Sequence, residues 1–137
     1  MERSFLNIVT IDGRICRIAE LGFHADRPSF DGGGIIFRQG DKYKKICLDT
    51  GMMTSASEPQ TECIRTSPSG SYSIRCEIEQ PDENGFGYVH LILTDKEKNT
   101  ETVLTRFMGD ENSLGAMPFS EDSVSIAFFG YPERELG

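Results

Sequence analysis

The amino-acid sequence predicts an all-β fold: a single-domain antiparallel β-sandwich or small barrel of about eight strands, built from hairpins and a meander. Apolar and polar residues alternate along most of the chain, which is the period of a β-strand. Turn-forming residues such as Asp12-Gly13 separate the alternating segments. No window of useful length has apolar residues at helical spacing. The length of 137 residues suits one domain, so we assign residues 1–137 to it.

Two hairpins are expected in the N-terminal half. The first strand carries Phe5, Asn7, Val9 and Ile11 on one face, turns at Asp12-Gly13 and returns over residues 14–18. The second hairpin joins GIIFR to YKKICLD through a turn at Gln39-Gly40-Asp41. The glycine-rich PSFDGGG of residues 28–34 is interpreted as a flexible loop, and residues 50–62 as a long loop or a short edge element.

The C-terminal half predicts a meander. In residues 72–79 the apolar residues alternate with Ser73, Arg75, Glu77 and Glu79, which indicates one core face and one charged face. The expected neighbouring strands read YVHLILTD and ETVLTRF. Residues 108–118 indicate a loop with one helical turn, and PFSEDSVSIAFFGYP contains a last strand.

Residues 67–129 carry a recognisable pattern. SPSGSYSIRCEIE, GYVHLILTD and TETVLTRF together resemble one blade of a WD40-like or TolB-like (PD40) β-propeller, and PFSEDSVSIAFFG is similar to the start of a second. Ser69 stands where the blade-opening turn usually has aspartate, and the first half of the chain lacks the repeat. A propeller closes its ring with at least four blades. The pattern therefore implies a meander sheet that buries its apolar face against the N-terminal hairpins.

Charge is divided unevenly along the chain. The net charge is −8; residues 1–68 contain nine basic and nine acidic side chains, whereas residues 69–137 contain five basic and thirteen acidic ones. Such asymmetry is typical either of an interaction surface or of an acidic face that keeps a protein soluble. It argues against nucleic-acid binding, which needs clustered lysine and arginine, because the one basic segment is the short RQGDKYKK of residues 38–45.

The motifs of common catalytic and metal sites are missing from the sequence. The DGGG segment precedes a strand, whereas a phosphate-binding glycine loop precedes a helix N-terminus. Glu77 and Glu79 share a strand face at roughly the carboxylate spacing of glycoside hydrolases, but they alternate with Arg75 in what we expect to be a solvated surface. His24 and His90 form no local metal-binding pair. We therefore expect no enzymatic activity, no cofactor and no metal.

The four cysteines and the N-terminus suggest a compartment. Cys16, Cys47, Cys63 and Cys76 include no C-x-x-C pair, and we expect free thiols, with an exported disulfide protein as the alternative. The first strand lacks the features of a signal peptide, and no apolar run is long enough to span a membrane. We expect a cytoplasmic protein without a membrane partner.

A small acidic protein without catalytic residues is expected to act by binding. In general properties the chain is similar to small acidic bacterial immunity proteins, so the leading hypothesis is an inhibitor that covers the active site of a basic toxin, with a nuclease as one candidate. The predicted partner-binding residues are acidic or aromatic: Glu77, Glu79, Asp82, Glu83, Phe86, Tyr88, Asp95, Glu97, Asp110, Glu111, Glu121 and Asp122.

Two other hypotheses stay open from the sequence. One is a small β-barrel that binds a ligand inside or acts as a barrel-type enzyme, with His90 or Tyr72 as the polar group on its inner face. The other is an accessory or assembly subunit, whose acidic half serves only solubility.

Overall fold

The computed structural model describes residues 4–59 and 62–132 as eleven strands and one 3₁₀ turn. The elements are β1 (Ser4–Thr10), β2 (Ile15–Leu21), β3 (Asp26–Asp31), β4 (Gly34–Gln39), β5 (Lys42–Cys47), β6 (Met53–Ala56), β7 (Tyr72–Glu79), β8 (Gly87–Asp95), β9 (Thr100–Gly109), η1 (Glu111–Ser113), β10 (Ser125–Phe129) and β11 (Tyr131–Pro132).

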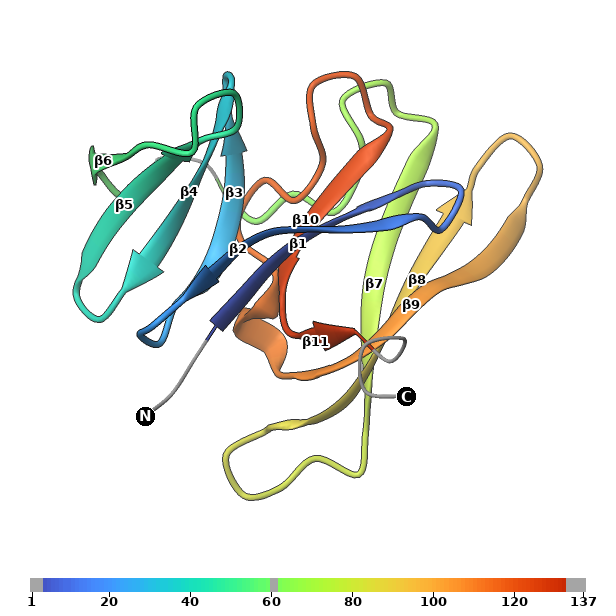
Figure 1. Cartoon of the computed structure of the whole chain (residues 1–137). Helices are drawn as coiled ribbons and strands as arrows, with labels where there is room; N and C mark the ends of the chain where they lie inside the picture. Colours follow the sequence, from blue (N-terminus) through green and yellow to red (C-terminus); the bar gives the residue numbers. More distant parts are fainter. Residues whose placement is uncertain (1–3, 60–61, 133–137) are drawn as a thin grey trace.

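The strands form three antiparallel sheets. Their orders are β10-β1-β2, β11-β9-β8-β7 and β3-β4-β5-β6. In Figure 1 the three-stranded sheet lies between the other two, so we call it the middle sheet and its neighbours the β7–β9 sheet and the β3–β6 sheet. The chain therefore forms three face-to-face layers, and the described strands close into no barrel.

The middle sheet joins the two ends of the chain. β1 pairs with its sequence neighbour β2 on one side and with β10 on the other, where Leu6 opposes Phe129 and Val9 opposes Ile126. Because side chains alternate across a strand, these two pairs point to opposite faces of the sheet. Both faces of the middle sheet are thus apolar.

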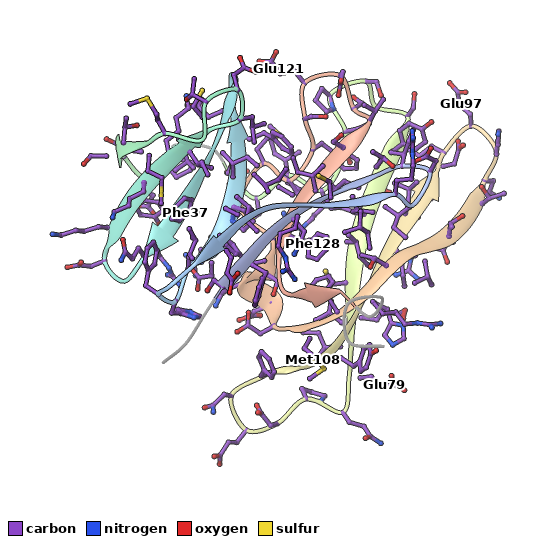
Figure 2. All side chains as sticks on the ribbon, viewed as in Figure 1. Phe37, Glu79, Glu97, Met108, Glu121 and Phe128 are labelled. Atoms are coloured by element: carbon purple, nitrogen blue, oxygen red, sulfur yellow. The ribbon has the colours of Figure 1, made fainter. Side chains whose placement is uncertain are left out.

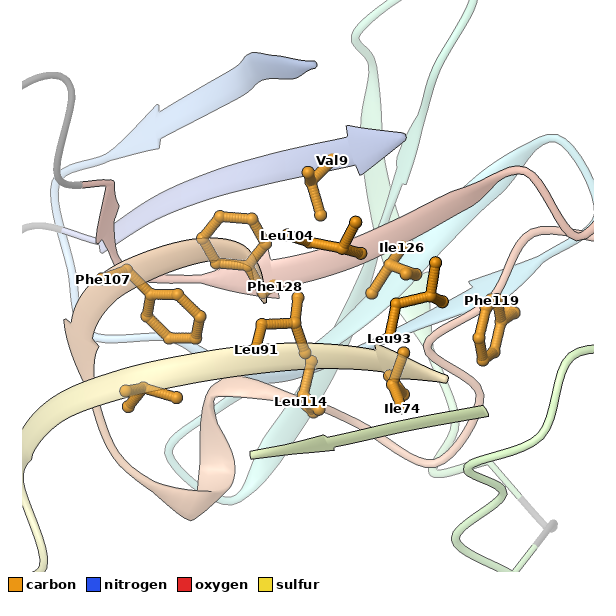
Figure 3. Close-up of a cluster of buried hydrophobic side chains, with 11 residues drawn as sticks. Val9, Ile74, Leu91, Leu93, Leu104, Phe107, Leu114, Phe119, Ile126 and Phe128 are labelled. Carbon is orange, nitrogen blue, oxygen red and sulfur yellow. The ribbon is translucent and has the colours of Figure 1, made fainter. Parts of the chain in front are cut away.

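The first hydrophobic core fills the space between the middle sheet and the β7–β9 sheet. Val9, Ile126 and Phe128 meet apolar side chains of β7, β8 and β9, as Figure 3 shows. The rings of Phe107 and Phe128 stack with their centroids 4.4 Å apart, and both side chains are fully buried. Ile74 is buried in this core, and Tyr72, Cys76 and Ile78 pack against it. These contacts confirm the core face expected for residues 72–79.

The second core lies on the other face of the middle sheet. Leu6, Ala127 and Phe129 pack there against Ile35 and Phe37 of the β3–β6 sheet. The rings of Phe37 and Phe129 meet edge to face at 5.8 Å. Every second residue of β10 therefore belongs to one core and the residues between them to the other.

A partly buried ion pair ties the first two strands of the β3–β6 sheet together. Arg38 Nε and Nη2 donate to Asp26 Oδ1 and Oδ2 at 2.8 and 2.7 Å, and Asp26 is buried. This bond is the first cause that raises the pKa of Arg38. The two hydrogen bonds and the positive charge of Arg38 compensate the cost of burying the Asp26 carboxylate.

The all-β prediction is confirmed, but the expected loop at residues 28–34 is wrong in its first part. Ser29, Phe30 and Asp31 pair with β4, and only the turn around Gly32 and Gly33 is loop. Proline lacks an N–H group and is unfavourable inside a sheet. The structure accommodates Pro28 at a β-bulge between Asp26 and Ser29 on an edge strand, where that donor is not needed.

The strand count also exceeds the expected eight. The 50–62 segment contains the short edge strand β6, which agrees with one of the two expectations for it. Residues 108–118 hold one 3₁₀ turn in a loop, as expected. No described helix is long and apolar enough to cross a membrane.

We predict that Phe128→Ala lowers the free energy of unfolding by about 3–5 kcal/mol, because it leaves a cavity in the first core. Val103→Ala is the control, since Val103 lies in β9 but is 44% exposed; its effect should stay below about 1 kcal/mol. Urea denaturation measures both values. Equal effects would contradict the assignment of Phe128 to a packed core.

Candidate partner-binding site

Two loops meet at one end of the β7–β9 sheet. The loop from β7 to β8 and the turn from β9 into η1 are brought together because Gly87 pairs with Gly109. The chain packs closely there: a Cβ on Gly87 would lie 2.8 Å from the carbonyl oxygen of Glu79, and one on Gly109 would lie 2.4 Å from Ser113 Oγ. A side chain at residue 87 would thus meet backbone, and one at residue 109 would displace the Ser113 hydroxyl.

Asp82 organises the loop between β7 and β8. Its Oδ1 accepts hydrogen bonds from the backbone N–H groups of Asn84 and Phe86 at 2.9 and 3.0 Å. Gly85 adopts a φ of +82°, which closes the turn. The aspartate thus sets the conformation of the segment that carries Phe86, whose side chain is 42% exposed.

Asp110 has the same role in the second loop. It caps η1 by accepting from the backbone N–H of Asn112 at 2.9 Å, while Ser113 Oγ accepts from the backbone N–H of Asp110 at 3.1 Å. This reciprocal pair is a capping box. It leaves the neighbouring Glu111 exposed to solvent.

Five carboxylates surround this end of the molecule, which we call the acidic end: Glu79, Asp82, Glu83, Asp110 and Glu111, together with Phe86 and Tyr88. A hollow of about 240 Å³ between the two loops is lined by residues of both, including Pro81, Asn84, Asp110 and Glu111. Residues 76–95 and 107–133 contain no lysine or arginine.

Glu79 is partly compensated at the edge of the acidic end. Its Oε2 lies 3.1 Å from Nε2 of His90 on the next strand, and Arg106 Nε donates to His90 Nδ1 at 3.3 Å. Because the arginine donates to Nδ1, this geometry places the proton of the neutral imidazole on Nε2. Glu83 and Glu111 are exposed residues of the loops themselves, and Glu111 also lines a hollow together with Arg27 and Arg65.

The other predicted site residues lie elsewhere. Figure 2 shows Glu97 and Glu121 at the opposite end of the molecule from Glu79. Glu77 is on the outer face of the β7–β9 sheet, where Arg75 contacts it at 3.3 Å and also pairs with Glu101. The twelve residues therefore do not form one continuous face.

The carboxylates of the opposite end serve turn structure. Asp95 Oδ1 accepts from the backbone N–H groups of Glu97 and Lys98. Asp122 accepts from the Ser120 hydroxyl, which holds the pKa of this carboxyl below its usual range, and from the backbone of Val124. Such side-chain-to-backbone bonds are the ordinary reason for aspartate in turns.

The described structure does not place His90 and Tyr72, the polar residues expected on the inner face of a barrel, around an interior ligand cavity. His90 lies on the outer face of its sheet, and Tyr72 packs partly buried against the first core. Among the described residues the space between the sheets is filled by large side chains such as Phe107, Phe119 and Phe128. The described strands therefore form open sheets and no closed barrel.

Histidine, cysteine and carboxylate side chains are the groups that could hold a metal ion or supply a reactive thiol. No group of three histidine, cysteine, aspartate or glutamate side chains within residues 4–59 and 62–132 is arranged to hold a metal ion. The four cysteines are free. Burial raises the pKa of the Cys76 thiol to about 11, whereas a hydrogen bond with the Thr50 side chain lowers the pKa of Cys47.

Sequence reasoning missed a second hollow. Arg27, Arg65 and Tyr43 line a cavity of about 450 Å³ together with Asn112 and Gly115. These residues come from β3, β5, the segment before β7 and the loop after η1, and no local motif connects them.

Comparison with known proteins gives a likeness of fold. The chain is similar to the solved structure of a putative TolB from Agrobacterium tumefaciens, with a TM-score of 0.66 and 9% sequence identity, covering 94% of this chain and 98% of that chain. No protein-family model matches the chain, and no curated protein does. The TolB-like blade resemblance of residues 67–129 is thus supported at the level of fold. The identity is too low to carry any function across.

We predict that Asp82→Ala loosens the loop between β7 and β8. The backbone amides of Asn84 and Phe86 lose their acceptor, so their hydrogen exchange should speed up at least about tenfold, as expected for a bond worth about 1 kcal/mol or more. Asp82→Asn keeps an acceptor oxygen and should preserve protection. Glu83→Ala is the matched control; loosening by this variant as well would contradict the role of Asp82.

We predict that Cys47 is alkylated much faster than Cys76 at pH 8, because the thiolate is the reacting species and burial keeps Cys76 protonated. Timed iodoacetamide labelling followed by peptide mass spectrometry measures both rates. A difference of at least about tenfold is expected from the opposite pKa directions. In urea the two rates should converge, and equal rates in the folded protein would disprove the burial of Cys76.

Proposed function

We propose that this chain is a non-catalytic binding protein whose acidic end takes a basic protein partner. The observation that carries the proposal is the convergence of two loops that contain no lysine or arginine. The exposed Phe86 of the first loop lines a neighbouring hollow together with Gly109, Asp110 and Ser113. The distant likeness of fold is compatible with a binding role and does not specify a partner.

The two components of the acidic end contribute differently to binding. Exposed carboxylates such as Glu83 and Glu111 attract a positively charged surface and accelerate its encounter, an effect that salt screens. An aromatic side chain that is buried on binding supplies the anchor, because aromatic residues are enriched among the residues that dominate interface energy. Phe86 is positioned for this by the hydrogen bonds of Asp82.

In its most specific form the proposal is an immunity-type inhibitor of a basic toxin in the cytoplasm. A toxin that acts on nucleic acid needs a positively charged active site to bind phosphate. The acidic end would cover that site and compete with the nucleic acid. This mechanism uses charge and shape and requires no reacting group on the inhibitor.

We predict that the double variant Glu83→Lys/Glu111→Lys loses binding to the basic partner, with an association rate at low salt reduced about tenfold or more. The partner is captured from the native cell extract with the wild-type chain and released by rising salt. The matched control is Glu97→Lys/Glu121→Lys, which makes the same change of charge at the opposite end.

The Phe86→Ala variant tests the contribution of the aromatic anchor independently of the charged residues. It should weaken binding by about 2 kcal/mol, roughly thirtyfold, mainly through faster dissociation. Equal loss in both charge variants would show attraction to net charge alone. Capture of no basic protein, or retention of binding by the Glu83/Glu111 variant, would overturn the proposal.

A further inference from the structure

A second hollow on the molecule brings two arginine side chains together in its lining. Its volume of about 450 Å³ falls within the usual range of small-ligand sites. The wall is built from Arg27 of β3, Arg65 of the segment before β7, Tyr43 of β5 and the loop after η1. The cavity therefore lies where the β3–β6 sheet meets the loops that lead into and out of the β7–β9 sheet.

Residues 112–115 accept a hydrogen bond from each of the two guanidinium groups. Arg27 Nε donates to Asn112 Oδ1 at 3.1 Å, and Arg65 Nη1 donates to the carbonyl oxygens of Gly115 at 2.9 Å and Ile64 at 3.1 Å. Each bonded nitrogen is one of three in its guanidinium, which has five N–H donors in total. Both groups are thus oriented by the protein and keep donors for a further acceptor.

The backbone under the cavity is unusually constrained. Arg27 adopts a φ of +52°, in the left-handed region that residues with a side chain rarely occupy, at the bulge of β3. Gly115 packs directly on it: a Cβ there would lie 2.3 Å from the carbonyl oxygen of Pro28 and 2.7 Å from that of Arg27. Such strain persists where the surroundings enforce it and clusters at ligand sites.

The cavity also contains two carboxylates. Glu58, which accepts from the Tyr43 hydroxyl at 3.3 Å, and Glu111 lie in the same lining as the two arginines. Leu114, Ala116 and Pro59 add an apolar part. The charged lining therefore sums to zero, in a protein whose net charge of −8 opposes the approach of a simple anion.

We infer that this cavity binds a small zwitterion of the amino-acid class with an apolar side chain. A carboxylate suits the remaining guanidinium donors of Arg27 and Arg65, which are charge-assisted donors of fixed geometry. An ammonium group suits Glu58 and Glu111, and the apolar side chain covers Leu114 and Ala116. A zwitterion has no net charge for the field of the protein to repel.

The test uses L-leucine as the probe and two derivatives that each lack one charge. The full chain is titrated with L-leucine, with 4-methylpentanoate, which lacks the ammonium group, and with 3-methylbutylamine, which lacks the carboxylate. Arginine Nε–H signals in a ¹⁵N-correlated NMR spectrum report on the site. We expect saturable shifts of the Arg27 and Arg65 signals with leucine, and binding at least about tenfold weaker for each derivative.

Arg27→Gln removes one guanidinium from an exposed position and should weaken leucine binding about tenfold or more. Arg14→Gln is the matched control, because Arg14 is exposed and paired with Asp12 outside the cavity. An unchanged thermal midpoint establishes that each variant is folded. The inference fails if leucine causes no saturable shift, if either derivative binds as tightly as leucine, or if both variants bind it alike.

Discussion

The pairing of β1 with β10 is the contact on which the rest of the structure depends. It brings the two ends of the described chain into one sheet, and that sheet supplies the inner wall of both hydrophobic cores. Phe128 belongs to the first core and Phe129 to the second, so a single strand serves two layers. Without this pairing the outer sheets would each expose an apolar face. The pairing is non-local, and such contacts cost chain entropy before they stabilise the fold.

The three-layer arrangement decides where loops accumulate. Loops of the β7–β9 sheet and of the β3–β6 sheet converge beside η1, which lines both the hollow of the acidic end and the cavity of Arg27 and Arg65. Within the described part of the chain, large side chains such as Phe107, Phe119 and Phe128 fill the space between the sheets. Both proposed sites therefore lie at loops and at the strands beside them, which the sheets hold in place.

The two proposed sites use charge in opposite ways. At the acidic end the carboxylates belong to loops without lysine or arginine, and their field extends toward a large basic partner. In the cavity, guanidinium and carboxylate groups are mixed, which favours a small ligand that carries both charges. The net charge of −8 therefore has a different effect at each of the two proposed sites. In the two proposals it attracts a basic partner to the acidic end and opposes the approach of a simple anion to the cavity.

The sequence by itself determined the all-β class, the hairpin at Asp12-Gly13, the apolar face of residues 72–79 and the acidic character of the second half. These features are local, because alternation and turn chemistry are written in neighbouring residues. Tertiary structure alone decided that β1 pairs with β10, that Pro28 fits a bulge, and that Glu79 and Glu111 lie at one end while Glu97 and Glu121 lie at another. It also assembled the cavity from four segments. Register and long-range pairing depend on which surfaces bury each other, and no spacing along the chain encodes that choice.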